Sequence, residues 1–97
     1  MLLKFSDIGN SLGTRVVAQK IRLDIENSLG NNDFVTFDFS NVNSISHSFA
    51  DECFGKLLLS WGISELKSKT TFTNANDLIK QTIAFTLKER SEKMSVA

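Results

Sequence analysis

Apolar residues in this chain switch repeatedly between the spacing of a strand and the spacing of a helix, and this switching limits the fold more than any other feature. In the segment FVTFDF, residues 34–39, the side chains of Val35, Phe37 and Phe39 fall on one face because strand side chains alternate. Three phenylalanines among these six residues predict a central strand. Two further strands are predicted, at residues 1–5 and 69–73.

Three segments have the period of an amphipathic helix. Val17, Ile21, Ile25 and Leu29 recur at every fourth position, and Gly30 is expected to end this helix in the left-handed conformation. A second helix is predicted from about Phe49 to Gly62 and is expected to bury Cys53, Phe54, Leu57, Leu58 and Trp61. A third helix carries Leu78, Ile79, Ile83 and Leu87, with its cap at Asn74 or Asn76 and a frayed tail at residues 91–97.

The resulting order is β-α-β-α-β-α. Strands that alternate with helices predict a largely parallel sheet with helices packed on it, because parallel neighbours need a crossover connection. The chain has 97 residues, no proline, no internal repeat and no linker-like segment. We therefore predict a single small α/β domain over residues 1–97.

Charge and hydropathy limit the partners. Eleven basic residues balance eleven acidic ones, so no whole-chain field attracts nucleic acid or an anionic membrane. No apolar run approaches the roughly 18 residues that span a bilayer, and the start MLLKFSD does not resemble a signal peptide. We expect a soluble cytoplasmic protein with neither nucleic acid nor membrane as a partner.

The titratable residues do not predict catalysis. His47 is the only histidine and Cys53 the only cysteine, so a zinc site would have few ligands, and no metal or other cofactor is expected. Cys53 is predicted to be a buried packing residue. A hydrolase is not predicted from Ser46 or Ser48 together with His47 and Asp51. A nucleophile, a base and an orienting carboxylate must converge on one point, and adjacent residues at the start of a helix do not converge in this way. We expect no enzyme activity.

The loop from Gly9 to Arg15 is the place for an alternative function. It lies between a predicted strand and a predicted helix, where backbone N–H groups attract anions. A P-loop needs four residues between its glycines and a following lysine, whereas three residues separate Gly9 from Gly13 and Thr14-Arg15 follows. A small nucleotide- or anion-binding domain therefore stays an alternative, with these candidate residues: Gly9, Ser11, Gly13, Thr14 and Arg15.

The stretch DFSNVNSISHSFADE, residues 38–52, is the main candidate site. Ser48 stands three residues before Asp51 at the start of an apolar helix, which approximates a capping box, so Ser46 or Ser48 is expected to cap this helix. A serine at a helix start is also a hydroxyl whose phosphate would meet backbone N–H groups and a favourable dipole. Both serines are therefore candidates for phosphorylation.

The same stretch resembles the STAS domain, named for sulfate transporters and anti-sigma factor antagonists. In that family a strand end and a turn precede Asp-Ser-Ser-Gly at the start of a helix. Here Val42 and Ile45 match the apolar positions. The family's aspartate is replaced by Ser46, its two serines correspond to His47 and Ser48, and its glycine is replaced by Phe49. The Gly13-Thr14-Arg15 region together with Ser-Phe-Ala-Asp at residues 48–51 is most similar to a small STAS-like family of bacterial proteins.

The resemblance implies a non-enzymatic regulatory module that binds a protein partner and is switched by serine phosphorylation. It implies, as that partner, a serine kinase of the histidine-kinase-like ATPase type. A homodimer formed through exposed aromatic residues is a further alternative. The predicted partner-binding surface consists of Ser40, Asn41, His47, Ser48, Phe49, Asp51 and Glu52.

Overall fold

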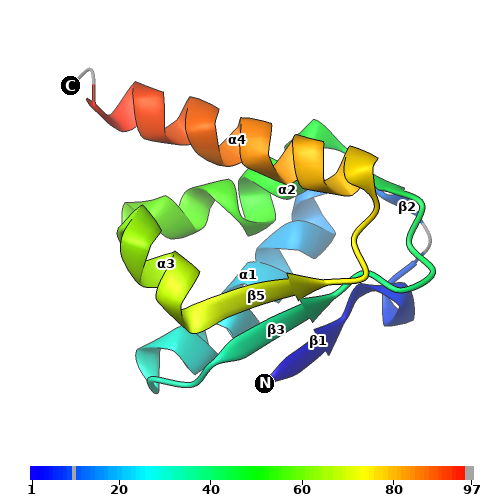
Figure 1. The fold of residues 1–97 in the computed structure, drawn as a ribbon, viewed down its shortest axis with the longest axis horizontal. Coiled ribbons are helices and arrows are strands. Elements are labelled where there is room, and N and C mark those ends of the chain that lie inside the picture. Colours follow the sequence, from blue (N-terminus) through cyan, green and yellow to red (C-terminus); the bar gives the residue numbers. More distant parts are fainter. Residues whose placement is uncertain (10, 96–97) are drawn as a thin grey trace.

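The computed structural model describes residues 1–9 and 11–95. Within them, five strands alternate with four α-helices and two 3₁₀ helices (Figure 1). Their order is β1 Leu2–Lys4, η1 Phe5–Asp7, β2 Ser11–Leu12, α1 Arg15–Gly30, β3 Val35–Asp38, β4 Ser44–Ile45, α2 His47–Cys53, η2 Gly55–Leu59, α3 Ile63–Lys69, β5 Thr70–Thr73 and α4 Asp77–Ser95.

The main sheet has three parallel strands in the order β1-β3-β5. Phe37 in the central strand lies opposite Leu3 on one side and Phe72 on the other. Strand β3 is therefore central, as the phenylalanine-rich segment predicted, and the expected α/β class with a parallel sheet is confirmed.

The helices cover one face of this sheet. Successive strands advance across the sheet in a single direction, and right-handed crossovers between them place every intervening helix on the same side (Figure 1). The alternation along β3 agrees, because Val35 and Phe37 are buried whereas Thr36 and Asp38 are partly exposed. The opposite face is open, although parallel sheets are usually covered on both faces. The domain thus has two layers.

Phenylalanine side chains form the centre of the core between the sheet and the helices. Phe5 stacks on Phe39 with ring centroids 4.5 Å apart, and Phe37 meets Phe54 edge-on at 5.2 Å. Cys53 is buried in the same core, as expected. Burial raises the pKa of its thiol far above the ordinary range, so it is not a reactive group.

The predicted helix over residues 49–62 is broken into separate elements. Helix α2 ends at Cys53, and Gly55 begins η2 where a Cβ atom would lie only 2.8 Å from Oδ1 of Asp51. Gly62 does not close a helix as predicted; it is extended and precedes α3, a helix that the sequence did not predict. The break lets the chain turn and reach the edge strand β5.

Other helix ends also differ from the predictions. Gly30 is the last residue of α1 and is not left-handed, whereas Asn32 takes the left-handed conformation with φ of 67°. The buried stripe of α1 begins with Ala18, while Val17 is exposed. Helix α4 continues to Ser95, through most of the predicted frayed tail; residues 96–97 lie outside the described part.

Two short strands, β2 and β4, form a second parallel pair that the sequence did not predict. Their pairing places the loop before α1 beside the segment that opens α2. No helix in the described part of the chain is long and apolar enough to cross a bilayer.

Candidate functional site

The two candidate segments of the sequence lie together in the structure. The backbone N–H of Ser46 donates to the carbonyl oxygen of Leu12 at 2.8 Å, and Oγ of Ser46 donates to that of Gly13 at 3.2 Å. The loop of residues 9–15 and the start of α2 therefore form one surface. Asn10 and the side chain of Ser11 lie outside the described residues.

The serines at the start of α2 have different roles. Ser46 is the cap, because its Oγ accepts a hydrogen bond of 3.0 Å from the backbone N–H of Phe49. Its hydroxyl thus both donates and accepts. Ser48, one of the two expected caps, lies within the helix, is partly exposed and makes no side-chain hydrogen bond with a described residue.

The loop after β3 is held by the carboxylate of Asp38. Oδ1 of Asp38 accepts hydrogen bonds from the backbone N–H of Ser40 at 2.9 Å, from its hydroxyl at 2.7 Å and from Nδ2 of Asn74 at 3.0 Å. These bonds from Ser40 and Asn74 lower the pKa of Asp38 to about 2. Asn41 follows in the left-handed conformation with φ of 62° and is exposed.

Asn76 fixes α4 to the same loop. Its Nδ2 donates to the carbonyl oxygen of Asn43 at 2.9 Å, and its Oδ1 accepts from the backbone N–H of Ile79 at 2.8 Å. Of the two predicted caps, Asn76 is confirmed. The start of α4 and the loop before α2 are thereby held together at the carboxyl ends of β3 and β5, the edge of a parallel sheet where ligands usually bind.

A network of charges joins α1, α2 and α4. The carboxylate of Asp51 accepts from Nη2 of Arg90 at 2.7 and 2.8 Å and from Nη1 of Arg15 at 3.1 Å. Glu52 is buried and is paired with Arg22, with Lys56 at 3.0 Å and with Arg15 at 3.3 Å.

Both carboxylates stay ionised at neutral pH. Burial raises the pKa of Asp51, but hydrogen bonds from Arg90 and Arg15 outweigh it, so the pKa lies below its ordinary value. Burial likewise acts on Glu52, and hydrogen bonds from Lys56 and Arg22 lower its pKa overall. The guanidinium group of Arg15, in turn, has its pKa raised by Asp51.

Several predicted surface residues are therefore not available to a partner. Phe49 is fully buried because it packs in the aromatic core, and Glu52 is 5 % exposed because its carboxylate lies among three basic groups. Asp51 is partly buried and paired, and the hydroxyl of Ser40 is bonded to Asp38. Of the predicted surface, Asn41 and His47 are exposed, and Ser48 is partly exposed with no side-chain hydrogen bond to a described residue.

The predicted anion loop is also occupied by internal contacts. Arg15 is paired with Asp51 and Glu52, and Oγ1 of Thr14 accepts from the backbone N–H of Val17 as the cap of α1. Gly13 accepts from Ser46. The geometry therefore does not favour anion binding by this loop.

Helix α4 adds residues that the sequence analysis missed. His47 packs against Phe85 with ring centroids 5.7 Å apart, and its Nε2 lies 3.3 Å from Oε1 of Glu89. Leu78 and Phe85 are 56 % and 58 % exposed and lie on one face of α4, since seven residues make nearly two turns. Phe85 lies off the apolar stripe predicted for this helix and was the signal in the sequence, whereas Leu78, which that stripe included, is exposed. We call this patch the His47 surface: His47, Ser48, Leu78, Phe85 and Glu89.

The family model for the STAS-like domain of unknown function (DUF4325) matches residues 17–80, which include β3, the whole of α2 and β5. This chain belongs to that family. No curated protein and no solved structure matches the chain significantly. Arg15, Phe85 and Arg90 lie outside the matched residues of the STAS-like domain.

The polar groups of this STAS-like domain form neither a metal site nor a catalytic relay in the described residues. Within residues 1–9 and 11–95, no three histidine, cysteine, aspartate or glutamate side chains are grouped to hold a metal ion. His47 faces Glu89, and Asp51 faces two arginines, so Ser48, His47 and Asp51 do not form a relay. The hydroxyl of Ser48, one residue along α2 from the exposed His47, forms no hydrogen bond with a described residue.

Proposed function

We propose that this STAS-like domain is a non-enzymatic regulatory module that binds a protein partner through the His47 surface, and that phosphorylation of Ser48 weakens the complex. The observation that carries the proposal is the free, partly exposed hydroxyl of Ser48 next to the exposed ring-bearing residue His47. The neighbouring serine, Ser46, has its hydroxyl bonded on both sides and is a poorer substrate.

Exposed apolar side chains support a protein as the partner. Phe85 and Leu78 each expose more than half of their surface beside polar residues, and aromatic side chains at the centre of such a patch are typical of interfaces. The rigid hydrogen bonds of Asp38 and Asn76 keep this edge of the domain preformed, so little conformational entropy is lost on binding.

Charge supports the switch. A phosphoserine carries about −1.5 to −2 charges at neutral pH. Asp51 lies one turn after Ser48, but Arg90 and Arg15 already compensate its charge. The phosphate would therefore add negative charge to the surface without facing an uncompensated carboxylate. A partner that binds the parent surface would then meet a charge that repels its acidic groups or must lose its bound water on contact.

The partner implied by the family resemblance is a serine kinase of the histidine-kinase-like ATPase type. We would purify such an ATPase encoded beside this chain and measure its dissociation constant for the parent, Ser48→Asp and, as a matched control, Ser60→Asp. Ser60 is an exposed serine after η2. We expect Ser48→Asp to bind at least about tenfold more weakly, a difference of about 1.4 kcal/mol, and to melt like the parent.

Two results would remove the switch from this proposal. Ser48→Asp binding as tightly as Ser60→Asp would show that charge at this position has no effect. A large fall in the melting temperature of Ser48→Asp alone would show that the serine has a structural role.

A further inference from the structure

A second site lies on the other side of α4, between this helix and the edge strand β5. It is a cavity of about 450 Å³ whose lining includes Phe37, Phe54 and Leu57. Phe72 of β5 and Ile83 and Leu87 of α4 form facing walls, and α3 closes one end. This volume lies within the roughly 300–1,000 Å³ that is usual for small-molecule pockets.

The side chains that line this cavity are mostly apolar. Oγ1 of Thr70 already donates to the carbonyl oxygen of Leu66 at 2.6 Å. In the described part of the chain, no buried side-chain nitrogen or oxygen lacks a hydrogen-bond partner. A nucleotide or sugar would lose its hydrogen bonds to water here without replacement, so the part of a ligand that enters must be apolar.

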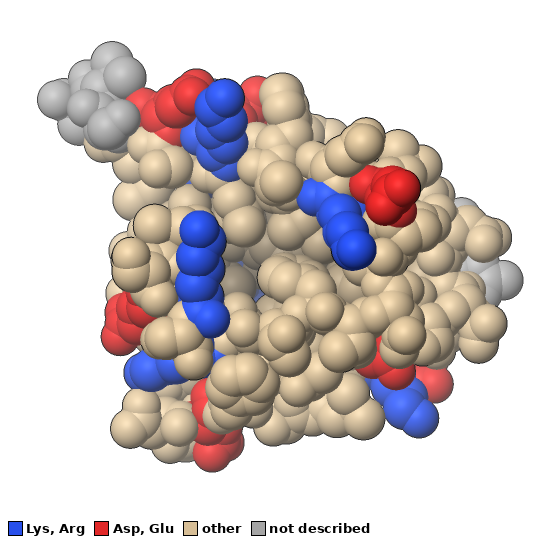
Figure 2. Space-filling view, viewed as in Figure 1, with Lys and Arg blue, Asp and Glu red and all other residues tan. Residues whose placement is uncertain are grey.

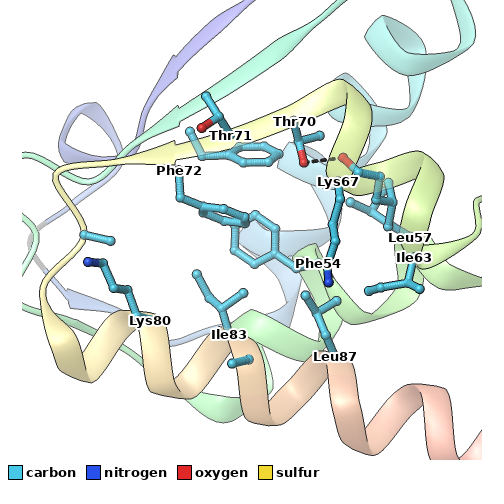
Figure 3. A pocket seen from close by; sticks show the side chains of 14 residues that line it. Phe54, Leu57, Ile63, Lys67, Thr70, Thr71, Phe72, Lys80, Ile83 and Leu87 are labelled. Atoms are coloured by element: carbon cyan, nitrogen blue, oxygen red, sulfur yellow. Dashed lines mark hydrogen bonds between the residues drawn. The ribbon is translucent and has the colours of Figure 1, made fainter.

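The mouth of the cavity is basic. Lys67 extends from α3 and Lys80 from the beginning of α4 (Figure 3), and neither forms an ion pair with a described residue. In the space-filling view, basic side chains flank the hollow on both sides (Figure 2). Unpaired ammonium groups at the rim of an apolar cavity favour a ligand with an anionic end.

The cavity continues as a groove along α4. An adjoining hollow of about 370 Å³ shares Ile63, Lys67 and Leu87 with it and is also lined by Lys88 and Glu92. The whole space is therefore long and apolar, with positive charge at its rim, and this shape suits a hydrocarbon chain better than a compact ring system.

We propose that this cavity binds a long-chain carboxylate, with the hydrocarbon chain between β5 and α4 and the carboxylate at one end of the mouth, where it meets Lys67 or Lys80 (Figure 3). The site is separate from the His47 surface, since the two use opposite faces of α4. The proposal does not depend on Ser48 or on a protein partner.

The test uses dodecanoate below its micelle concentration and calorimetric titration of the purified chain. The parent is expected to bind one dodecanoate per chain. The double variant Lys67→Ala/Lys80→Ala should bind dodecanoate about 1.4- to 5-fold more weakly, as the loss of one exposed charge pair implies. Lys20→Ala is the matched control, because Lys20 is an exposed helical lysine on α1 with no ion pair, and it should bind like the parent. Dodecyltrimethylammonium should bind more weakly than dodecanoate.

A blocking variant tests the location. Ala84 lines both hollows from an exposed position on α4, so Ala84→Trp can fill them without entering the core and should abolish binding while circular dichroism stays that of the parent. Absence of dodecanoate binding by the folded parent, or equal binding by Ala84→Trp, would overturn the proposal. The proposal would also be overturned if the parent sediments as a dimer and Ala84→Trp sediments as a monomer, because a second copy of the chain would then occupy the cavity.

Discussion

Two serines only two residues apart, Ser46 and Ser48, illustrate how different the roles of neighbouring residues are in this domain. Ser46 caps α2 through the backbone N–H of Phe49 and also donates to Gly13, whereas the hydroxyl of Ser48 makes no contact of this kind. The sequence predicted a cap at one of them. The choice depends on the contact with Gly13, which follows β2 and lies 33 residues before Ser46.

The two alanine variants should therefore differ in stability. Ser46→Ala removes the cap and should lower the free energy of unfolding by about 1 kcal/mol, while Ser48→Ala should stay within about 0.5 kcal/mol of the parent. Urea denaturation of both variants measures this difference. Equal destabilisation by the two changes would contradict the assignment of the cap.

The charge network predicts how stability depends on pH. The pKa of Asp51 is lower in the folded chain than in the unfolded one, so its contribution is complete above the unfolded pKa of about 4 and is lost as the pH falls through the lower folded pKa. Asp51→Asn should be less stable than the parent at pH 7, and the difference should shrink below about pH 4. Melting curves from pH 3 to 7 test this; a difference that grows on acidification would contradict the pairing with Arg90.

This network could not be predicted from the sequence. Asp51 lies 36 residues from Arg15 and 39 from Arg90, and no local pattern relates such positions. The sequence analysis therefore treated Asp51 and Glu52 as free surface charges, and only packing of α1 and α4 against α2 brings the arginines to them.

Among the secondary-structure elements, the central strand was the easiest to predict and is the most important for stability. Phe37 is 1 % exposed, whereas Phe34, directly before β3, is 52 % exposed. Phe37→Ala should cost roughly 3–5 kcal/mol of unfolding free energy, because it removes buried apolar surface and leaves a cavity. Phe34→Ala is the control and should cost much less. Thermal or urea unfolding that shows equal losses would contradict the placement of the strand.

Elements without a strong local pattern were missed. Helix α3 carries only Ile63 and Leu66 as large apolar residues in seven positions, too few to display a helical period. Strands β2 and β4 have two residues each and exist because they pair with each other. At Gly55, after the break, a Cβ atom would also lie 3.3 Å from Cγ2 of Thr86 in α4, a tertiary contact that no local pattern displays.

At the scale of the whole molecule, α4 separates two surfaces. One of its faces carries Leu78 and Phe85, and Phe85 packs against His47. The other faces the lysine-rimmed cavity with Ile83 and Leu87 (Figure 3). The alternation of strands and helices was sufficient to predict the α/β class and the parallel sheet. It did not predict that the outer face of the sheet, with Thr36 and Thr71, is uncovered, because this depends on strand order and crossover direction.

The open sheet face offers a partner a second place to bind, so mapping the contact tests the central claim most directly. In the ¹⁵N-labelled domain, titration with the histidine-kinase-like ATPase should perturb the amide resonances of His47, Ser48 and Phe85. Those of Thr36 and Thr71 should stay unchanged, since they lie on the opposite side of the sheet from the helices. Perturbations confined to Thr36, Thr71 and their neighbours would contradict the proposal that the His47 surface receives the partner.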